Sequence, residues 1–353
     1  MSPALRKRTP WSLAALCAAA LLVAACGQPA EEETRHRFTA MGTLVDVSIW
    51  GAPPLEAEAA AREIEALFVT LHAAWDPWGA GALGTVNRAL AAGEAIRPDP
   101  DLAALLDEAA ALTEATGGLF DPAIGALVRL WGFSDDESRP VAPPPANEIA
   151  ARLAATAPLP ELLADGVVQG PPGAQLDLGG FLKGVAVERG IELLLARGIE
   201  HAIVNAGGDL RAIGRRGERA WRIGIRAARD NTIVAALEVA DGEAVFTSGD
   251  YERYFDYAGR HYHHILDPRT GYPTRGIASV TVVHDDAALA DAGATALLVA
   301  GPEDWPRMAD ALGLDRVLVV LEDGAVELTG ALQPRIWFTD EEQGRRVRVR
   351  PLP

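Results

Sequence analysis

Lysine and cysteine are the scarce residues of this chain. Its 353 residues include two lysines, Lys7 and Lys183, against 30 arginines, and two cysteines, Cys17 and Cys26. Because both cysteines stand near the N-terminus, the remainder of the chain excludes disulfides, a thiol nucleophile and a thiolate metal site. A single lysine in a protein that otherwise uses arginine indicates a position where the two cations are not interchangeable.

Basic residues are outnumbered as well. The chain carries 49 acidic and 32 basic residues, a formal net charge of −17, and removal of residues 1–25 would make it −20. Such an acidic surface repels phosphate backbones, so we expect no nucleic-acid partner. The apolar fraction of 49% is ample for a packed core of one large domain or two.

The N-terminus has the pattern of a targeting segment. Arg6, Lys7 and Arg8 precede about fifteen mostly apolar residues, the length of a signal core rather than a membrane span. The letters VAAC then place small residues before Cys26, as at a lipoprotein processing site; an ordinary secretory signal is the alternative. We therefore predict a lipoprotein signal peptide at 1–25, with the protein extracytoplasmic and anchored by a lipid on Cys26 to a bacterial membrane, on its periplasmic face.

The remaining chain reads as one folded domain. We place a polar tether at 26–36, the domain at 37–340 and a C-terminal tail at 341–353, with RRVRVRP as a solvated edge strand. Apolar periodicity predicts an extended segment at 37–50 and many short strands between 201 and 284. It predicts helices at 55–75, 101–118, 180–198, 287–300 and 303–312. This mixed order with hairpin-like returns indicates an α+β fold, an antiparallel sheet core with packed helices.

Two motifs are weaker than they look. GAGALG (79–84) matches a dinucleotide fingerprint, but a helix rather than a strand precedes it, and no acidic residue follows at the required distance. HYHH (261–264) places His261 and His263 on one strand face, as a transition-metal site would. We favour a polar wall of a binding site there over a transition-metal site.

Glycine-rich turns with a nearby carboxylate recur along the chain. LFDP contains Asp121, QLDLGGFLKG contains Asp177 and Lys183, and VNAGGDL contains Asn205 and Asp209. Glycines let a ligand approach the backbone and leave N–H groups free for phosphate oxygens, although each turn can also be purely structural.

Asp291 and Thr295 form a candidate pair of ligands in ADAGATALL. They stand at i and i+4, on one face of a predicted helix of small and apolar residues. A carboxylate and a hydroxyl suit magnesium that keeps waters and substrate phosphates as its other ligands. The structural alternative is a helix N-terminal aspartate and a threonine that bonds backward. We expect Asp291 to be a helix-surface carboxylate that contributes little to stability.

Ordered motifs between residues 38 and 340 resemble one known family. They are MGT (41–43), GLFDP (118–122), DLGGFLKG (177–184), NAGGD (205–209), WRIGI (221–225), TSGDYER (247–253), HHILDPRTG (263–271) and ADAGATA (290–296). In this order they resemble the FAD:protein FMN transferases, the ApbE or flavin transferase lipoprotein family. The resemblance implies an ApbE-like, T-fold-like single catalytic domain.

The resemblance also implies a reaction and a set of site residues. FAD, as a magnesium-bound substrate, is split at its pyrophosphate, FMN passes to a threonine hydroxyl of a target flavoprotein, such as a subunit of a membrane redox complex, and AMP leaves. Gly180, through its carbonyl, would hold the metal with Asp291 and Thr295, and His264 would polarise or deprotonate the incoming hydroxyl. The residues implied to contact the flavin nucleotide are Met41, Trp75, Leu119, Phe120, Asp121, Asp177, Lys183 and Ile265.

Attack on a pyrophosphate requires mainly positioning and charge neutralisation, so it needs no enzyme nucleophile. Lys183 would supply a compact ammonium among glycines, where a guanidinium fork would not fit. Two alternatives remain open at this point: an FAD pyrophosphatase that gives FMN and AMP, and a non-catalytic, lipid-anchored flavin-binding protein. Trp75, where the family often has tyrosine, and GTVN (84–87) depart from the family pattern at the pocket entrance.

Overall fold

The computed structural model describes residues 33–134, 141–226, 232–339 and 347–353. The predicted signal peptide and the first part of the tether lie outside the described residues. Within the described ranges, no helix combines the length and the apolar character needed to cross a membrane.

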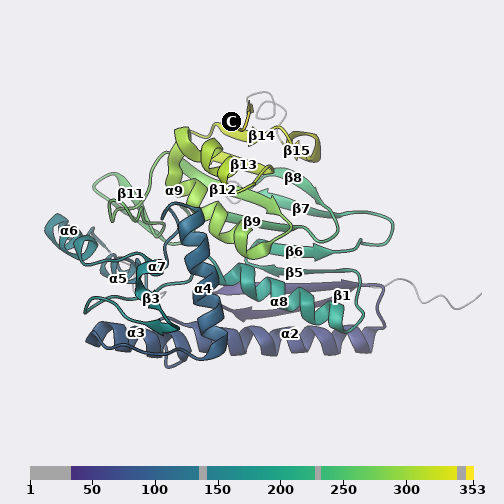
Figure 1. Ribbon diagram of the computed structural model, residues 1–353. Coiled ribbons are helices and arrows are strands. Elements are labelled where there is room, and N and C mark those ends of the chain that lie inside the picture. The colour runs from purple at the N-terminus through teal and green to yellow at the C-terminus, as the bar shows by residue number, and fades with distance from the viewer. Residues whose placement is uncertain (1–32, 135–140, 227–231, 340–346) are drawn as a thin grey trace, which may run out of the picture.

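A large antiparallel sheet is the centre of the described fold (Figure 1). Its nine strands lie in the order β1-β2-β5-β6-β9-β12-β13-β14-β16, and every neighbouring pair is antiparallel except β14 and β16. The strands are β1 (Glu33–Ala40), β2 (Thr43–Trp50), β5 (Ala202–Ala206), β6 (Asp209–Ile213), β9 (Ala244–Gly249), β12 (Ile277–His284), β13 (Val317–Leu321), β14 (Val326–Thr329) and β16 (Arg348–Arg350). The predicted antiparallel α+β fold is confirmed.

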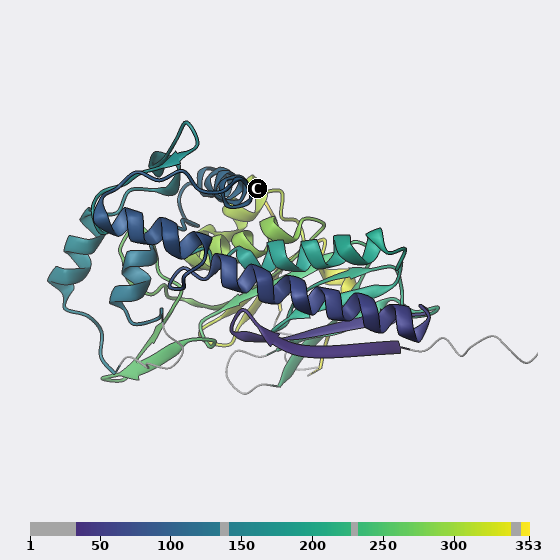
Figure 2. The same ribbon diagram turned by 90° about the horizontal axis from the view of Figure 1, so that it is seen from below.

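Helices pack against one face of this sheet, and α2 runs beside α8 along the edge of the molecule (Figure 2). The main apolar core lies between the helices and the sheet. The helices are α2 (Pro54–Trp75), α3 (Ala82–Ala92), α4 (Pro100–Ala115), α5 (Gly125–Leu130), α6 (Ala146–Ala154), α7 (Leu159–Leu162), α8 (Leu182–Ala196), α9 (Ala287–Ala311) and the short 3₁₀ helix η1 (Gln333–Arg335).

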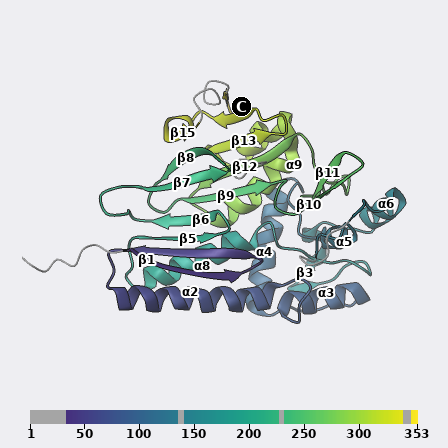
Figure 3. The ribbon, with the colours of Figure 1, turned by 180° about the vertical axis from the view of Figure 1, so that it is seen from behind.

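A smaller sheet covers the opposite face, as the view from behind shows (Figure 3). It has the order β15-β8-β7 and encloses a second apolar core against the large sheet. Two ribbons, β10–β11 and β3–β4, complete the described strands. The bounds are β3 (Leu163–Ala164), β4 (Val167–Val168), β7 (Trp221–Arg226), β8 (Ile233–Val239), β10 (Tyr254–Tyr257), β11 (Arg260–His263) and β15 (Ile336–Phe338).

The predicted helices follow their local signals. In α4, the side chain of Asp99 accepts hydrogen bonds from the N–H groups of Asp101 and Leu102, and Pro100 occupies the first turn. Gly117 and Gly118 then take φ of 60° and 81°, so the chain leaves the helix where a glycine pair allows it. The two helices predicted at 287–300 and 303–312 are present as α9, kinked at Gly301, whose φ is 83°.

Two predicted boundaries are wrong. Strand β1 begins at Glu33, so residues 33–36 belong to the sheet and not to a tether, because they pair with the second half of β2. The segment assigned to a C-terminal tail supplies β16, which pairs with β14 at the sheet edge as the edge-strand prediction required. Arg350 there forms an ion pair at 2.8 Å with buried Glu327.

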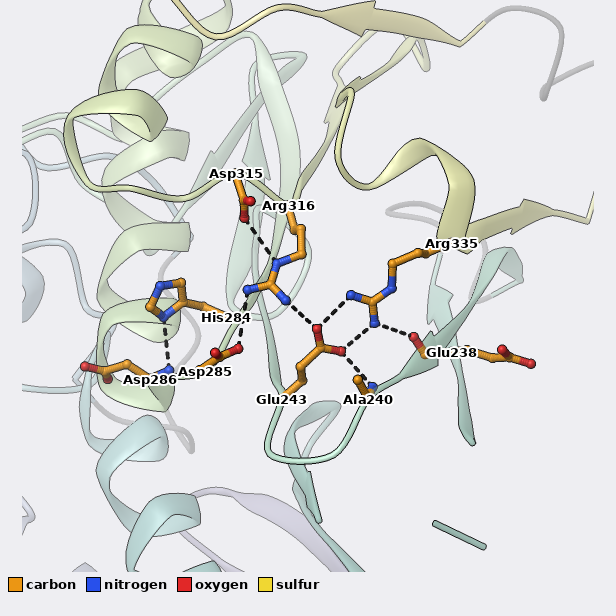
Figure 4. A network of polar contacts seen from close by, with 9 residues as sticks. All are labelled: Glu238, Ala240, Glu243, His284, Asp285, Asp286, Asp315, Arg316 and Arg335. Carbon is orange, nitrogen blue, oxygen red and sulfur yellow. Dashed lines mark hydrogen bonds and ion pairs between the residues drawn. The ribbon is translucent and has the colours of Figure 1, made fainter. Parts of the chain in front are cut away.

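A buried carboxylate connects the two sheets (Figure 4). Glu243, in the turn between β8 and β9, accepts a hydrogen bond from Arg335 at 2.7 Å and pairs with Arg316. Arg335 also donates to the carbonyl of Glu238 at 2.9 Å. Burial opposes ionisation, but the two guanidinium groups and the N–H of Ala240 lower the pKa of Glu243 below its ordinary value. The network therefore holds the small sheet, and the cavity wall that it forms, against the large one.

Candidate active site

One cavity of about 1970 Å³ opens between the helices, the small sheet and the β10–β11 ribbon. Every residue that the sequence assigned to the site lines it, although these residues come from distant segments of the chain. They are Met41, Trp75, Leu119, Phe120, Asp121, Asp177, Gly180, Lys183, His264, Ile265, Asp291 and Thr295. This volume exceeds the range of roughly 300–1,000 Å³ that is usual for small-ligand pockets.

The three candidate metal ligands meet on one wall. Asp291 and Thr295 lie one turn apart on α9, and a Cβ placed on Gly180 would lie 3.3 Å from the Thr295 hydroxyl oxygen. The hydroxyl oxygens of Thr295 and Ser248 are 2.9 Å apart. A carboxylate, a hydroxyl and a nearby carbonyl are hard oxygen donors, so this group fits magnesium that takes its remaining ligands from substrate and water.

Asp291 is not on the helix surface, contrary to the expectation. It is 4% exposed, because α9 presses its first turns against the beginning of α8. Burial raises the pKa of Asp291 to about 7, with Lys183 acting in the opposite direction and Asp209 in the same one. Removal of this carboxylate therefore affects packing as well as chemistry.

The start of α8 is shaped to reach Asp291. The N–H of Gly184 donates to Asp291 Oδ2 at 2.9 Å, as a helix N-terminus does toward an anion. A side chain at Gly184 could not be accommodated, since its Cβ would lie 2.4 Å from the carbonyl oxygen of Ala287. Glycine here permits the close approach of two helix backbones, and that approach orients the carboxylate.

Lys183 lies between two buried carboxylates. Its ammonium forms an ion pair with Asp209, whose other oxygen accepts from the N–H of Thr247 at 2.8 Å. Burial acts to lower the pKa of Lys183, but Asp209 and Asp291 outweigh it and raise that pKa above its ordinary value. The ammonium is therefore permanently charged, and 32% of the side chain remains open to the cavity.

His264 follows the β10–β11 ribbon, which holds it at the cavity through the bond from its N–H to the carbonyl of Arg253 at 3.0 Å. Burial, Arg253, His263 and Lys183 lower the pKa of His264 well below its ordinary value, so the imidazole is neutral at pH 7. Its Nδ1 is buried and has no hydrogen-bond partner within the described residues. A neutral imidazole that lines the cavity can accept a proton or a hydrogen bond from a substrate hydroxyl.

The LFDP and DLGG turns form another wall. Asp121 uses Oδ1 to accept from the N–H groups of Ala123 and Leu159, at 2.9 and 3.1 Å. Its carboxylate thus shapes the turn around buried Leu119 and Phe120, which sequence reasoning did not anticipate. The N–H of Asp177 donates to the carbonyl of Pro122 at 2.8 Å, which joins the two turns.

The aromatic wall differs in one respect from expectation. Trp75, at the end of α2, is 2% exposed and belongs mainly to the core. Trp78, three residues later, lines the cavity with more of its surface free, and the guanidinium of Arg129 lies 5.8 Å from its ring centroid. Met41 reaches the cavity from the β1–β2 turn. The paired tryptophans of WDPW were the signal that could have indicated Trp78.

GAGALG and the pair His261 and His263 belong to the scaffold, whereas His264 of the same HYHH motif lines the cavity. GAGALG leads into α3 after helix α2, so no strand precedes it. His263 is buried and bonds through Nε2 to the carbonyl of Thr274 at 2.9 Å, whereas His261 contacts Asp256 at 2.9 Å. Among the residues that the structure describes, no three His, Cys, Asp or Glu side chains gather to hold a metal ion.

Asp209 and Ser248 are residues of this wall whose roles sequence reasoning missed. Asp209 stood in a glycine-rich turn as one carboxylate among several, and its contact with Lys183 depends on strand order. Ser248 stood in TSGDY without the glycine pattern of a nucleophile, and its contact is the hydroxyl of Thr295 on another element. Neither pairing has a signal in the local sequence.

Comparison with known proteins shows which family has these motifs. The sequence profile of the ApbE family matches residues 41–318. The chain belongs to the ApbE family. The FAD:protein FMN transferase of Rhodobacter capsulatus is 41% identical over 310 residues, which cover 86% of this chain and 58% of that protein. That of Treponema pallidum is 32% identical over 94% of this chain and 96% of its own length.

Solved ApbE structures have the same fold. The ApbE protein of Thermotoga maritima superposes with a TM-score of 0.79 and 34% identity, over 86% of this chain and 99% of that chain. The flavin transferase ApbE of Vibrio cholerae gives a TM-score of 0.74 and 28% identity, with coverages of 86% and 99%. The predicted family and its ApbE-like fold are confirmed.

Proposed function

We infer that this ApbE-family protein transfers FMN from FAD to a threonine hydroxyl of a target flavoprotein and releases AMP. The observation that carries the inference is the convergence of the family's motif residues on one large cavity, beside a buried carboxylate and a neutral histidine. The curated relatives named above act as FAD:protein FMN transferases.

The reaction replaces the phosphoanhydride bond of FAD with a phosphoester bond to the acceptor. The acceptor oxygen bonds to the phosphorus of the FMN half, the pyrophosphate bond breaks, and AMP leaves; the hydroxyl proton is released. A bound magnesium ion would neutralise pyrophosphate charge and make AMP a better leaving group. Asp291, Thr295 and the carbonyl of Gly180 would hold that ion.

The side chains of the site position the reacting groups and neutralise the charge of the phosphates. Lys183 offers a fixed positive charge to a phosphate oxygen. The His264 imidazole would accept the hydrogen of the incoming hydroxyl as the new bond forms. Phe120 and Ile265 present apolar surface that keeps bulk water from the reacting phosphorus.

The test is a reconstituted transfer. The protein, FAD, Mg²⁺ and a flavoprotein domain with an acceptor threonine are incubated, and both AMP and the intact mass of the domain are measured. We expect AMP to appear in step with a domain that has gained the mass of FMN less water, and no gain in a Thr→Ala acceptor. AMP and free FMN without attachment would identify a pyrophosphatase, and no AMP would identify a flavin-binding protein.

The anchor is a separate proposal. We propose that residues 1–25 are removed and that a lipid on Cys26 holds the protein to the periplasmic face of a bacterial membrane, because a basic start, a short apolar core and VAAC occur in order. Fractionation of cells that express Cys26→Ser should find soluble or unprocessed protein. Processed, membrane-bound Cys26→Ser would contradict the anchor.

A further inference from the structure

Two buried carboxylates compete for one ammonium in the cavity wall. Asp209 and Asp291 are 3% and 4% exposed, and both lie close enough to Lys183 to act on its charge. Within the part of the chain that the structure describes, Lys183 forms its ion pair with Asp209 and none with Asp291. Two carboxylates are therefore near the ammonium, and in the structure it pairs with Asp209.

Contacts other than the one with Lys183 hold the Asp209 carboxylate in place. Asp209 begins β6 directly after Gly207 and Gly208, whose φ values of 72° and 109° make the tight turn possible. Asn205 Oδ1 accepts from the N–H of Gly208 at 2.8 Å, and Asp209 Oδ1 accepts from the N–H of Thr247 on β9. The second oxygen of Asp209 is thereby directed at the ammonium.

Asp291 has different partners. Its Oδ2 accepts from the N–H of Gly184, and it is the one carboxylate among the three candidate metal ligands. An ammonium bound to Asp291 would neutralise the charge that attracts a cation, since a divalent ion and an ammonium cannot share one carboxylate without mutual repulsion. A lysine this close to a cation site is harmful unless it is held elsewhere.

We propose that Asp209 holds the Lys183 ammonium away from Asp291 and so keeps the carboxylate of the candidate metal site free for a divalent cation. The proposal rests on the proposed function, because it deepens the role of the same site. Asp209 is in this account a positioning residue that acts through Lys183. It also explains the single lysine, because an arginine fork could bridge both carboxylates at once.

The test is a double-mutant cycle read by cation binding. Mn²⁺, which prefers the same hard oxygen ligands, is titrated by electron paramagnetic resonance into the full chain without FAD. The variants are Asp209→Asn, which is isosteric and keeps an oxygen for the N–H of Thr247, Lys183→Met, and the two combined. Near-ultraviolet circular dichroism checks that each variant is folded.

We expect Asp209→Asn to weaken Mn²⁺ binding roughly 10-fold or more, because the released ammonium moves to Asp291. Lys183→Met should bind Mn²⁺ at least as tightly as the wild type. The double variant should return to within about 3-fold of Lys183→Met, since nothing then competes with the cation. A double variant as weak as Asp209→Asn, or an Asp209→Asn variant equal to the wild type, would overturn the proposal.

The scarcity of lysine supplies a second measurement that does not need Asp209→Asn to fold. In the full chain with Lys7→Arg, ¹⁵N-lysine labelling leaves Lys183 as the one labelled ammonium. We expect Asp291→Asn to change its Nζ signal little, because the ion pair with Asp209 persists. A change as large as that of an unpaired lysine would refute the assignment. Failure of the wild type to bind Mn²⁺ would instead contradict the proposed metal site, which separates the two failures.

Discussion

The contact between α8 and α9 can be tested with one added methyl group. In Gly184→Ala the new Cβ would lie 2.4 Å from the carbonyl oxygen of Ala287 and 2.9 Å from the Cα of Ala288. Both are backbone atoms, so no rotamer change relieves the overlap. Because carbon–oxygen contacts lie near 3.3 Å or above, the helices must separate by about 1 Å.

That separation has a calculable consequence. The bond from Gly184 N–H to Asp291 Oδ2 is 2.9 Å long, and about 1 Å more takes it out of hydrogen-bond range. Overpacking of this kind costs about 1–3 kcal/mol of the free energy of unfolding. A displacement of about 1 Å in a catalytic constellation lowers turnover on the order of 10²-fold. We therefore expect Gly184→Ala to be folded but nearly inactive.

Gly190→Ala is the matched control in the same helix. Its Cβ would meet side-chain atoms of Val204 and Phe68 at 3.4 and 3.5 Å, which is ordinary contact. Alanine is favoured over glycine in a helix by about 1 kcal/mol, so this variant should be at least as stable as the wild type. AMP release and urea denaturation are measured for both. Turnover of Gly184→Ala within 3-fold of Gly190→Ala would refute the argument that the backbone contact sets the site.

Three further predictions concern single side chains. His264→Ala should slow transfer to the acceptor by about 10²-fold while FAD titration shows retained binding, and a near-normal rate would leave His264 a pocket wall. Ser248→Ala should weaken Mn²⁺ binding about 10-fold, because a Thr295 hydroxyl that ligates a cation must donate its hydrogen elsewhere; equal affinity would contradict this role. Glu243→Gln should lower the free energy of unfolding at pH 7 by about 2 kcal/mol, less than a fully buried pair would, because Arg316 and Arg335 remain partly exposed. The folded-state pKa of Glu243 is depressed, so the stability that its charge contributes is complete above the unfolded-state pKa and is lost as pH falls through the folded-state pKa. The urea curves of wild type and Glu243→Gln should therefore converge in acid. A difference in stability that persists in acid would exclude the Glu243 charge as the source of that difference.

Local patterns predicted most elements of the fold. The helical periodicity of 55–75 and the glycine stops at 117–118 and 198 describe short-range physics, which a neighbouring segment rarely overrides. The predicted boundaries were wrong where pairing with a distant strand decides whether a segment is part of the sheet. Residues 33–36 look like a polar linker, yet they pair with β2, and the basic tail pairs with β14. Backbone pairing is satisfied across the chain and leaves little trace in the composition of the paired strand.

The motifs predicted which residues line the site but not how buried those residues are or what they contact. Asp291 was expected at a helix surface and is buried, and Asp121 was expected to contact the nucleotide and bonds to two backbone amides. Trp75 was expected at the flavin; it lines the cavity but is mostly buried in the core, whereas Trp78 keeps more of its surface exposed. Exposure depends on what packs against a residue, and that partner is distant in sequence.

The amino-acid sequence by itself determined the absence of cysteine after Cys26, the net negative charge, the single lysine after Lys7 and the family to which the ordered motifs belong. These properties depend on residue identity and order, which folding does not change. The tertiary structure alone decided that Lys183 pairs with Asp209, that Gly184 lets α8 touch α9, and that Ser248 meets Thr295. Each contact joins elements that are distant in the sequence. The charge state of each titratable group follows from the neighbours that folding brings within a few ångströms.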